Sequence, residues 1–117
     1  MKAVIEVAKP GSAVRTARTQ LAAARKGKTP DYHLSFESAR SLFSELTPAR
    51  VDLLDTLSKV GPCSVYALAK SAERNYSNVH TDVARLEELG LIQRTEVDAV
   101  FVPYESVEIL LPLAQVT

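Results

Sequence analysis

Apolar residues recur at helical spacing in the stretch between residues 64 and 92. From residue 76 to residue 89, a turn of about 3.6 residues gathers the apolar side chains on one face and the polar ones on the other. The apolar set is Val79, Val83 and Leu86. Gly90 follows at the position where a left-handed residue ends many helices. We therefore predict an amphipathic helix over residues 76–89.

A shorter helix is predicted directly before it. Ser64 can cap this helix, because its hydroxyl can accept a bond from an unpaired amide of the first turn. The break falls around residues 71–74, and Asn75 can cap the longer helix. Glu73 occupies a position where such turns usually carry glycine. Either Glu73 is strained or the turn has a different shape.

The chain before this helix pair alternates between strand and helix patterns. Residues 3–8 are rich in β-branched side chains and predict a strand, and residues 12–26 predict a basic helix with a narrow apolar stripe. After a linker at residues 27–31, alternation over residues 32–36 predicts a brief strand. The helix expected next has the apolar side Phe36, Ala39, Leu42, Phe43 and Leu46.

Thr47 and Pro48 form a strong helix start signal, a capping hydroxyl followed by proline at the first helical position. Gly61 and Pro62 end the same helix. Its expected buried side chains are Val51, Leu54, Leu57 and Val60, with Leu53 alongside. This helix would brace the helix pair and complete a three-helix core.

The chain after Gly90 reads as extended. Residues 91–95 and 99–102 predict two strands of a hairpin with an acidic tip at residues 96–98. The tip lacks an Asn-Gly or Asp-Gly turn, so the pattern does not fix the register. Residues 107–111 are too apolar to stay exposed, and we expect them to pair with another strand or with a second subunit.

Charge is unevenly distributed along the 117 residues, although the net charge is zero. Residues 1–30 carry +6, residues 31–60 carry −2, residues 61–95 carry zero, and residues 96–117 carry −4. Such a gradient fits a protein with one nucleic-acid face, and it fits equally well two terminal segments that pair with each other.

The sequence shows no catalytic or metal-ligand pattern. His33 and His80 fall in different segments, and the single Cys63 has no neighbours at metal-ligand spacing, so we expect neither an enzyme, a cofactor nor a metal. Cys63 reads as a buried small residue. With no apolar run of membrane-span length and no signal-peptide pattern, we expect a cytoplasmic protein without a membrane partner.

Residues 64–92 resemble the helix-turn-helix of winged-helix transcription regulators of the MarR and ArsR kind, without gaps through residues 86–92. The resemblance implies an α+β fold: a winged helix-turn-helix with an N-terminal β-α arm and a C-terminal β segment. We accordingly expect the arm at residues 1–30, serving dimerisation or contact with DNA or a partner. The winged helix-turn-helix domain is expected at residues 31–117.

A narrower resemblance covers roughly residues 34–112. It is carried by residues 36–39, 46–50, 61–64, 78–83 and 102–105. Together these segments are similar to small prokaryotic winged-helix regulators that include TumA-type antitoxins, which are encoded beside TumE-type toxins. The resemblance implies a homodimer that binds its own promoter and, in the antitoxin case, neutralises a cognate toxin protein.

The position of each polar residue in the helix pair suggests its role. Hydroxyl and amide groups can read base edges, which favours Ser77, Asn78 and Thr81. Arg74, Arg85 and Arg94 are expected to contact phosphates, which position a protein without specifying sequence. Tyr76 could donate to a phosphate or pack its ring. The candidate DNA-binding residues are Arg74, Asn75, Tyr76, Ser77, Asn78, Thr81, Arg85 and Arg94. His80 and Asp82 are expected to bond or pack locally rather than to contact DNA.

Two functions remain open. The first is a sequence-specific DNA-binding transcriptional regulator that acts as a dimeric autorepressor on double-stranded operator DNA, and also as an antitoxin if a toxin partner exists. It is favoured by the basic N-terminal helix and the polar outward face of the longer helix. The alternative is a winged-helix interaction module that binds a protein without contacting DNA. The low density of basic residues around residues 75–95 and the acidic hairpin tip favour the alternative.

Overall fold

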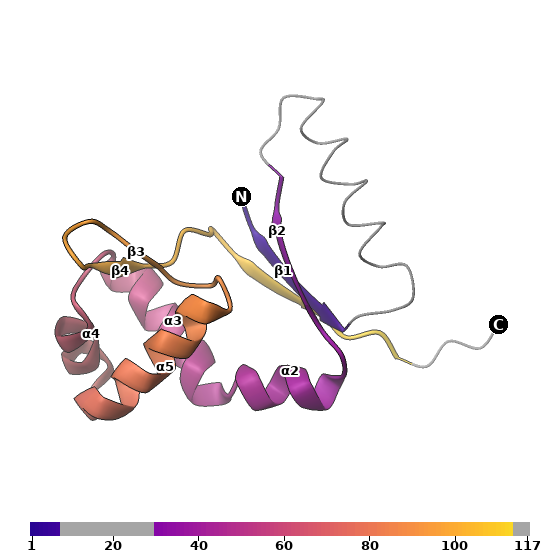
Figure 1. The fold of residues 1–117 in the computed structure, drawn as a ribbon, viewed down its shortest axis with the longest axis horizontal. Coiled ribbons are helices and arrows are strands. Elements are labelled where there is room, and N and C mark those ends of the chain that lie inside the picture. Colours follow the sequence, from indigo (N-terminus) through magenta and orange to yellow (C-terminus); the bar gives the residue numbers. More distant parts are fainter. Residues whose placement is uncertain (8–29, 114–117) are drawn as a thin grey trace. The chain divides into compact units, whose positions relative to one another are not determined.

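The computed structural model describes residues 1–7 and 30–113, which form two compact units with a mixed α and β fold (Figure 1). Unit 1 comprises Met1–Glu45 and Tyr104–Thr117, and unit 2 comprises Leu46–Pro103. Unit 2 is therefore inserted in the sequence between the two parts of unit 1. The basic helix expected over residues 12–26 lies outside the described residues. Within the described ranges, no helix is long and apolar enough to cross a membrane.

Unit 1 is built on a parallel three-stranded sheet in the order β2-β1-β5. The strands are β1 (Ala3–Val7), β2 (Tyr32–Phe36) and β5 (Val107–Leu110). Ile5 of the central strand stands opposite Leu34 on one side and Ile109 on the other. Helix α2 (Ala39–Glu45) lies against β1 and β2, with Leu42 fully buried. The predicted strands are confirmed, and the apolar run at residues 107–111 does pair with another strand.

The first residues of the chain form hydrogen bonds with both of the later segments that build unit 1, at Tyr32 and at Ser106. The Lys2 carbonyl accepts a hydrogen bond from the Tyr32 amide at 3.0 Å, and the Ala3 amide donates to the Ser106 carbonyl at the same distance. The Tyr32 and Tyr104 rings stack with centroids 5.6 Å apart. The two units do not divide at the expected domain boundary after residue 30. Strand β1 lies before that boundary, and its two partners, β2 and β5, lie after it.

Helix α2 starts later than its apolar pattern predicts. Phe36 completes β2, and the helix begins after Ser38, whose hydroxyl accepts a bond from the Ser41 amide at 3.1 Å. Phe43 is exposed rather than buried. The pattern fails here because Phe36, the last residue of the strand, stands three residues before Ala39 and so falls in phase with the apolar face of the helix.

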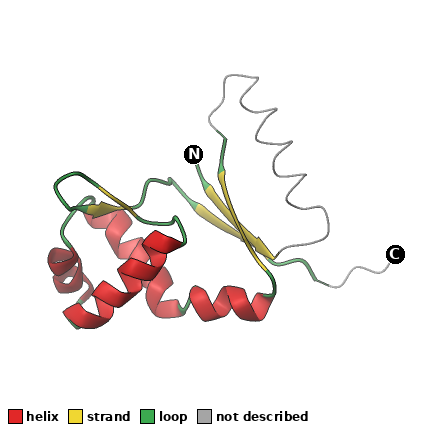
Figure 2. Ribbon diagram, in the orientation of Figure 1, coloured by secondary structure: helices red, strands yellow, loops and turns green. Residues whose placement is uncertain are grey.

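Unit 2 packs three helices with a short antiparallel hairpin (Figure 2). The helices are α3 (Pro48–Val60), α4 (Val65–Ala72) and α5 (Tyr76–Glu88), and the hairpin strands are β3 (Gln93–Arg94) and β4 (Val100–Phe101). The fully buried side chains of this unit are Leu53, Leu57, Leu68, Val79, Val83, Leu86, Leu91, Ile92 and Val100. Burying this apolar surface is the main force that holds the helices together.

The three helix starts match the sequence signals. Thr47 Oγ1 accepts from the Arg50 amide at 3.3 Å, Ser64 Oγ from the Ala67 amide at 3.0 Å, and Asn75 Oδ1 from the Asn78 amide at 3.2 Å. Each bond satisfies an amide that has no partner within its helix.

The predicted face of α3 is wrong at both ends. Val51 and Val60 are exposed, whereas Leu53, Leu54 and Leu57 are buried. Arg50 occupies the buried side in place of Val51, because it lies four residues before Leu54 and seven before Leu57.

The hairpin strands are shorter than predicted. The amides of Leu91 and Ile92 both bond to the Leu86 carbonyl, at 3.0 and 3.4 Å, so these two residues close the end of α5 rather than enter β3. Gly90 adopts the predicted left-handed conformation with φ of 79°.

Candidate nucleic-acid interface

The turn between α4 and α5 adopts the geometry for which glycine is usually used. Glu73 has φ 55° and ψ 44°, so the strained alternative is the observed one. The Arg74 amide donates to the Ala69 carbonyl at 3.0 Å and the Glu73 amide to the Lys70 carbonyl at 3.1 Å, which closes the end of α4. The left-handed conformation costs a residue with a Cβ about 1 kcal/mol. The hydrogen bonds of the turn hold it in place.

Asp82 on α5 is held between two arginines. Its Oδ1 accepts from Arg50 Nε of α3 at 3.0 Å, and its Oδ2 accepts from Arg74 Nη2 of the turn at 2.7 Å. Burial alone would raise the pKa of Asp82, but hydrogen bonds and charges of the two arginines outweigh it and lower that pKa. The predicted local role of Asp82 is confirmed. Arg74, a predicted phosphate ligand, is drawn into this cluster instead of projecting freely.

The exposed face of α5 carries uncharged polar groups over its first two turns. The exposed side chains there are Asn75, Tyr76, Ser77, Asn78, His80 and Thr81. None is acidic, and Asp82 is turned away into its arginine pair. Thr81 Oγ1 donates to the Ser77 carbonyl at 3.1 Å, which orients the hydroxyl while its lone pairs stay available. The predicted base-reading residues Ser77, Asn78 and Thr81 therefore lie together on one accessible surface.

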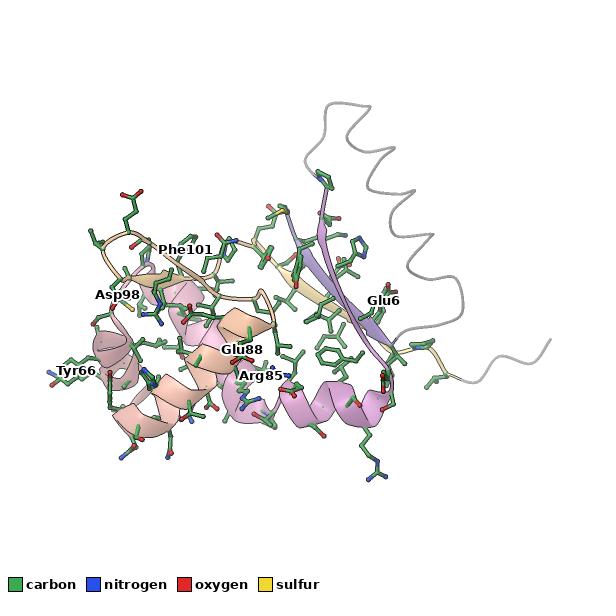
Figure 3. The ribbon with its side chains drawn as sticks, viewed as in Figure 1. Glu6, Tyr66, Arg85, Glu88, Asp98 and Phe101 are labelled. Carbon is green, nitrogen blue, oxygen red and sulfur yellow. The ribbon has the colours of Figure 1, made fainter. Side chains whose placement is uncertain are left out.

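An aromatic cluster links the exposed sides of α4 and α5. The Tyr76 ring lies 6.4 Å from the Tyr66 ring and 5.9 Å from the His80 ring, measured between centroids. Lys70 Nζ lies 5.9 Å from the centroid of Tyr66, which projects away from the helices in Figure 3. Sequence reasoning missed Tyr66 and Lys70. Their spacing of four residues could have placed them on one face, but it could not show that Tyr66 meets Tyr76 of the other helix.

Two predicted phosphate ligands have acidic partners in this structure. Arg85 Nη1 lies 2.8 Å from Glu88 Oε2, and Figure 3 shows both residues on α5. Arg94 of β3 bonds to Glu87 of α5 and, at 2.8 Å, to Asp98 of the hairpin. The hydrogen bonds to Glu87 and Asp98 raise the pKa of Arg94. A phosphate would have to displace these carboxylates.

Pairing of this kind extends through the whole of unit 2, in which every residue is described. Acidic side chains face each of its basic residues except Lys70. The unit holds six Lys or Arg and eight Asp or Glu, a net charge of −2. Its electrostatic attraction for a polyanion is consequently weak and depends on where the exposed groups lie.

The hairpin tip is a three-residue loop between Thr95 and Ala99. The Asp98 amide donates to the Thr95 carbonyl at 3.0 Å, and Asp98 adopts a left-handed φ of 64°, which Asp tolerates better than most residues. Val97 is 85% exposed at the tip. This turn fixes the register that the sequence left open.

Cys63 belongs to the same hairpin structure. It forms an isolated bridge with Val100 of β4, through bonds of 3.2 Å and 2.7 Å. The Cys63 side chain is half-buried rather than buried, so the predicted full burial is wrong. Partial burial raises the pKa of its thiol. Across the described residues, no three His, Cys, Asp or Glu side chains are grouped closely enough to hold a metal ion.

Comparison with protein-family models identifies a family for this chain. No curated protein matches the chain, and no solved structure matches it. The family model named HVO_A0114 matches residues 45–109, which include all of unit 2 and most of β5. Because this match covers more than half of the sequence, the chain belongs to the HVO_A0114 family.

Proposed function

We propose that the protein is a transcriptional regulator that binds double-stranded DNA through unit 2, used as a winged helix-turn-helix. Three features support this assignment. Helices α4 and α5 are joined by a turn of three residues, α3 packs behind them, and a β-hairpin follows. The bridge between Cys63 and Val100 adds a short third strand segment to that hairpin. The MarR and ArsR resemblance points to the same arrangement.

The exposed face of α5 carries the proposal. A major groove accepts a helix whose outward side chains are small or medium hydrogen-bonding groups. Ser77, Asn78 and Thr81 provide such groups, and the buried Val79 and Val83 fix their direction. In this proposal the three polar residues read base edges. Asn75 already uses its side-chain oxygen as the helix cap and keeps its amide donors for DNA.

Phosphate contacts come from the flanks of that face. Lys70, Tyr66 and Tyr76 form an exposed group beside the start of α5, with a cation and two phenol hydroxyls. Arg85 and Arg94 join them only when phosphate replaces their carboxylate partners. The proposed site therefore exchanges one set of charged contacts for another when DNA binds.

The test is a binding titration with the DNA upstream of the protein's own gene. Fluorescence anisotropy measures the binding at two salt concentrations, in the presence of unrelated competitor DNA. We expect specific binding that weakens as salt rises, because phosphate contacts release counterions. Equal binding to operator and competitor at both salt concentrations would contradict sequence reading by α5.

Two substitutions are expected to change DNA binding in different ways. Thr81→Ala should change the preference among operator variants, whereas Glu88→Gln should tighten binding to all of them, because Arg85 loses its Glu88 partner. Asp52→Asn, an exposed residue of α3, is the matched control for the change in total charge. An equal increase in DNA affinity for Glu88→Gln and Asp52→Asn would show that Arg85 does not contact DNA.

A protein-interaction module is the second candidate, favoured by the net charge of −2 and the paired basic residues of unit 2. If the DNA titration is negative, capture of the neighbouring gene product by the intact protein tests this alternative. The same capture experiment tests the toxin partner that the TumA-type resemblance implies. The dimer, which would match a two-fold operator, stays a prediction.

A further inference from the structure

Strand β5 is an outer strand of the unit 1 sheet. The order β2-β1-β5 gives it β1 as a neighbour on one side, and the described residues provide no strand on the other. It is also unusually apolar for an edge. The exposed large apolar side chains at this end of the chain are Val107, Ile109, Leu110, Leu111 and Leu113. An open apolar edge of this kind is a template for another strand.

The hydrogen-bond phase shows which main-chain groups are open. The Ser106 carbonyl accepts from Ala3 of β1, so the peptide groups of Ser106 face β1. Because successive residues of a strand direct their N–H and C=O groups to opposite sides, Val107 and Ile109 direct theirs to the open edge. Pro112 falls in the phase that faces β1, so its missing N–H leaves the open side intact.

Charge does not protect this edge. Glu108 is the only charged residue between Ser106 and Leu113, and its Oε1 lies 3.1 Å from Lys2 Nζ of the same chain. Natural edge strands usually carry unpaired charges, inward charges or bulges that repel a second strand. An edge whose single carboxylate is neutralised within its own subunit suits an identical edge, because two copies meet without net repulsion.

We propose that β5 pairs with β5 of a second copy of this chain, antiparallel about a two-fold axis at Ile109, so that two three-stranded sheets become one six-stranded sheet. In this register Ile109 faces Ile109 of the second copy, and Val107 faces Leu111. Glu108 faces Leu110 rather than another Glu108. The register therefore combines apolar pairs on one face with separation of the two carboxylates.

The inference rests on the dimeric part of the proposed function and not on DNA binding. A two-fold axis at β5 is isologous, so the same short segment serves both subunits and the assembly closes at two. Failure of the β5 contact and failure of DNA binding are distinguishable, because the oligomeric state is measured without DNA.

The first test is sedimentation velocity of the full chain over a concentration series. Wild-type protein should be a dimer that dissociates on dilution. Ile109→Lys should be monomeric throughout, because two like charges would stand opposite each other at the axis. Val60→Lys is the matched control, since Val60 of α3 is 48% exposed and Ile109 is 42% exposed. This control should remain dimeric.

The second test reads the register directly. In a hydrogen-bonded antiparallel pair the opposed Cα atoms lie about 5.5 Å apart, within the range that a disulfide spans. Ile109→Cys, in a Cys63→Ala background, should give a covalent dimer on mild oxidation. Val60→Cys in the same background should not. Ile109→Pro removes an outward N–H without touching the bonds to β1, and it should give a folded monomer by circular dichroism.

Three outcomes would overturn the proposal. The first is a wild-type protein that is monomeric at every concentration. The second is an Ile109→Pro variant that is folded and still dimeric. The third is a dimer in which Ile109→Cys forms no more cross-link than Val60→Cys, which would place the interface elsewhere. If Ile109→Lys fails to fold, the proline and cysteine variants still decide the matter.

Discussion

The two units of this chain are held together by contacts of different sequence range. In unit 2, α3, α4 and α5 follow one another in the sequence and each packs on the next. In unit 1, Ala3 pairs with Tyr32 on one side and with Val107 on the other. Contacts between distant residues form only after a long loop closes, which costs entropy and slows folding. The folding of unit 1 therefore requires both of its sequence segments, Met1–Glu45 and Tyr104–Thr117, whereas unit 2 is one continuous stretch of the chain.

The units also differ in the surfaces that they offer. Unit 2 presents an uncharged polar helix face, and its charged side chains form ion pairs within the unit, such as those of Asp82 with Arg50 and Arg74. Unit 1 presents the apolar outer strand β5. A polar face fits recognition of a hydrated partner such as DNA, and an apolar edge fits a contact between subunits. The difference supports the two proposals, in which unit 2 recognises DNA and unit 1 joins the subunits.

The largest effects are expected from core truncation in each unit. Ile5 of β1 and Leu86 of α5 are both fully buried, so Ile5→Ala and Leu86→Ala should each cost about 2–5 kcal/mol of unfolding free energy. Hydrogen exchange should show the loss of protection mainly in unit 1 for the first variant and mainly in unit 2 for the second. Equal loss throughout the chain in both variants would mean that the two units unfold as one.

The next effect concerns the Asp82 cluster. Asp82→Asn should cost about 2 kcal/mol at pH 7, because Arg50 and Arg74 lose their common carboxylate. The folded-state pKa of Asp82 lies below its ordinary value of 3.8, so its contribution is present above that value and disappears as the pH falls through the lowered one.

Urea denaturation at pH 7 and pH 3 measures this effect. The difference between wild type and Asp82→Asn should shrink on acidification, while Asp52→Asn, on the exposed side of α3, should stay close to wild type at both pH values. A difference between wild type and Asp82→Asn that does not change with pH would mean that the carboxylate charge contributes nothing.

A smaller effect, of opposite sign, is expected at the turn before α5. Glu73→Gly should stabilise unit 2 by about 1 kcal/mol, because glycine adopts the left-handed conformation without strain. Ser71→Gly, in the last turn of α4, is the control and should destabilise by about 0.5 kcal/mol. Thermal unfolding monitored by circular dichroism measures both. A destabilising Glu73→Gly would show that the Glu73 side chain contributes more than its backbone costs.

The smallest effect is expected at the exposed ion pair of the hairpin. Glu87→Gln should change the unfolding free energy by only about 0.5 kcal/mol, since solvent screens the pair and Asp98 remains as a partner of Arg94. The same variant should strengthen DNA binding if Arg94 contacts phosphate. A loss of stability as large as that of Asp82→Asn would show that the ion pair between Arg94 and Glu87 stabilises the fold as much as the Asp82 cluster does.

The sequence by itself determined the local features of this protein. The capping residues Thr47, Ser64 and Asn75, the left-handed Gly90 and the buried face of α5 all followed from neighbouring residues. These features depend on interactions within four or five positions, so a single sequence contains them. The polar surface of Ser77, Asn78 and Thr81 followed for the same reason, because it is the reverse of the buried face.

Only the tertiary structure decided which distant groups meet. The sequence marked β1 and β5 as strands but not as partners, because apolar alternation fixes which residues share a face and says nothing about which strand lies beside it. Likewise, Arg74 and Arg94 looked available for phosphate until the fold placed Asp82 and Glu87 against them. Charge pairing across elements depends on distances that form only when the core packs, and it is this packing that selected the partner of each arginine.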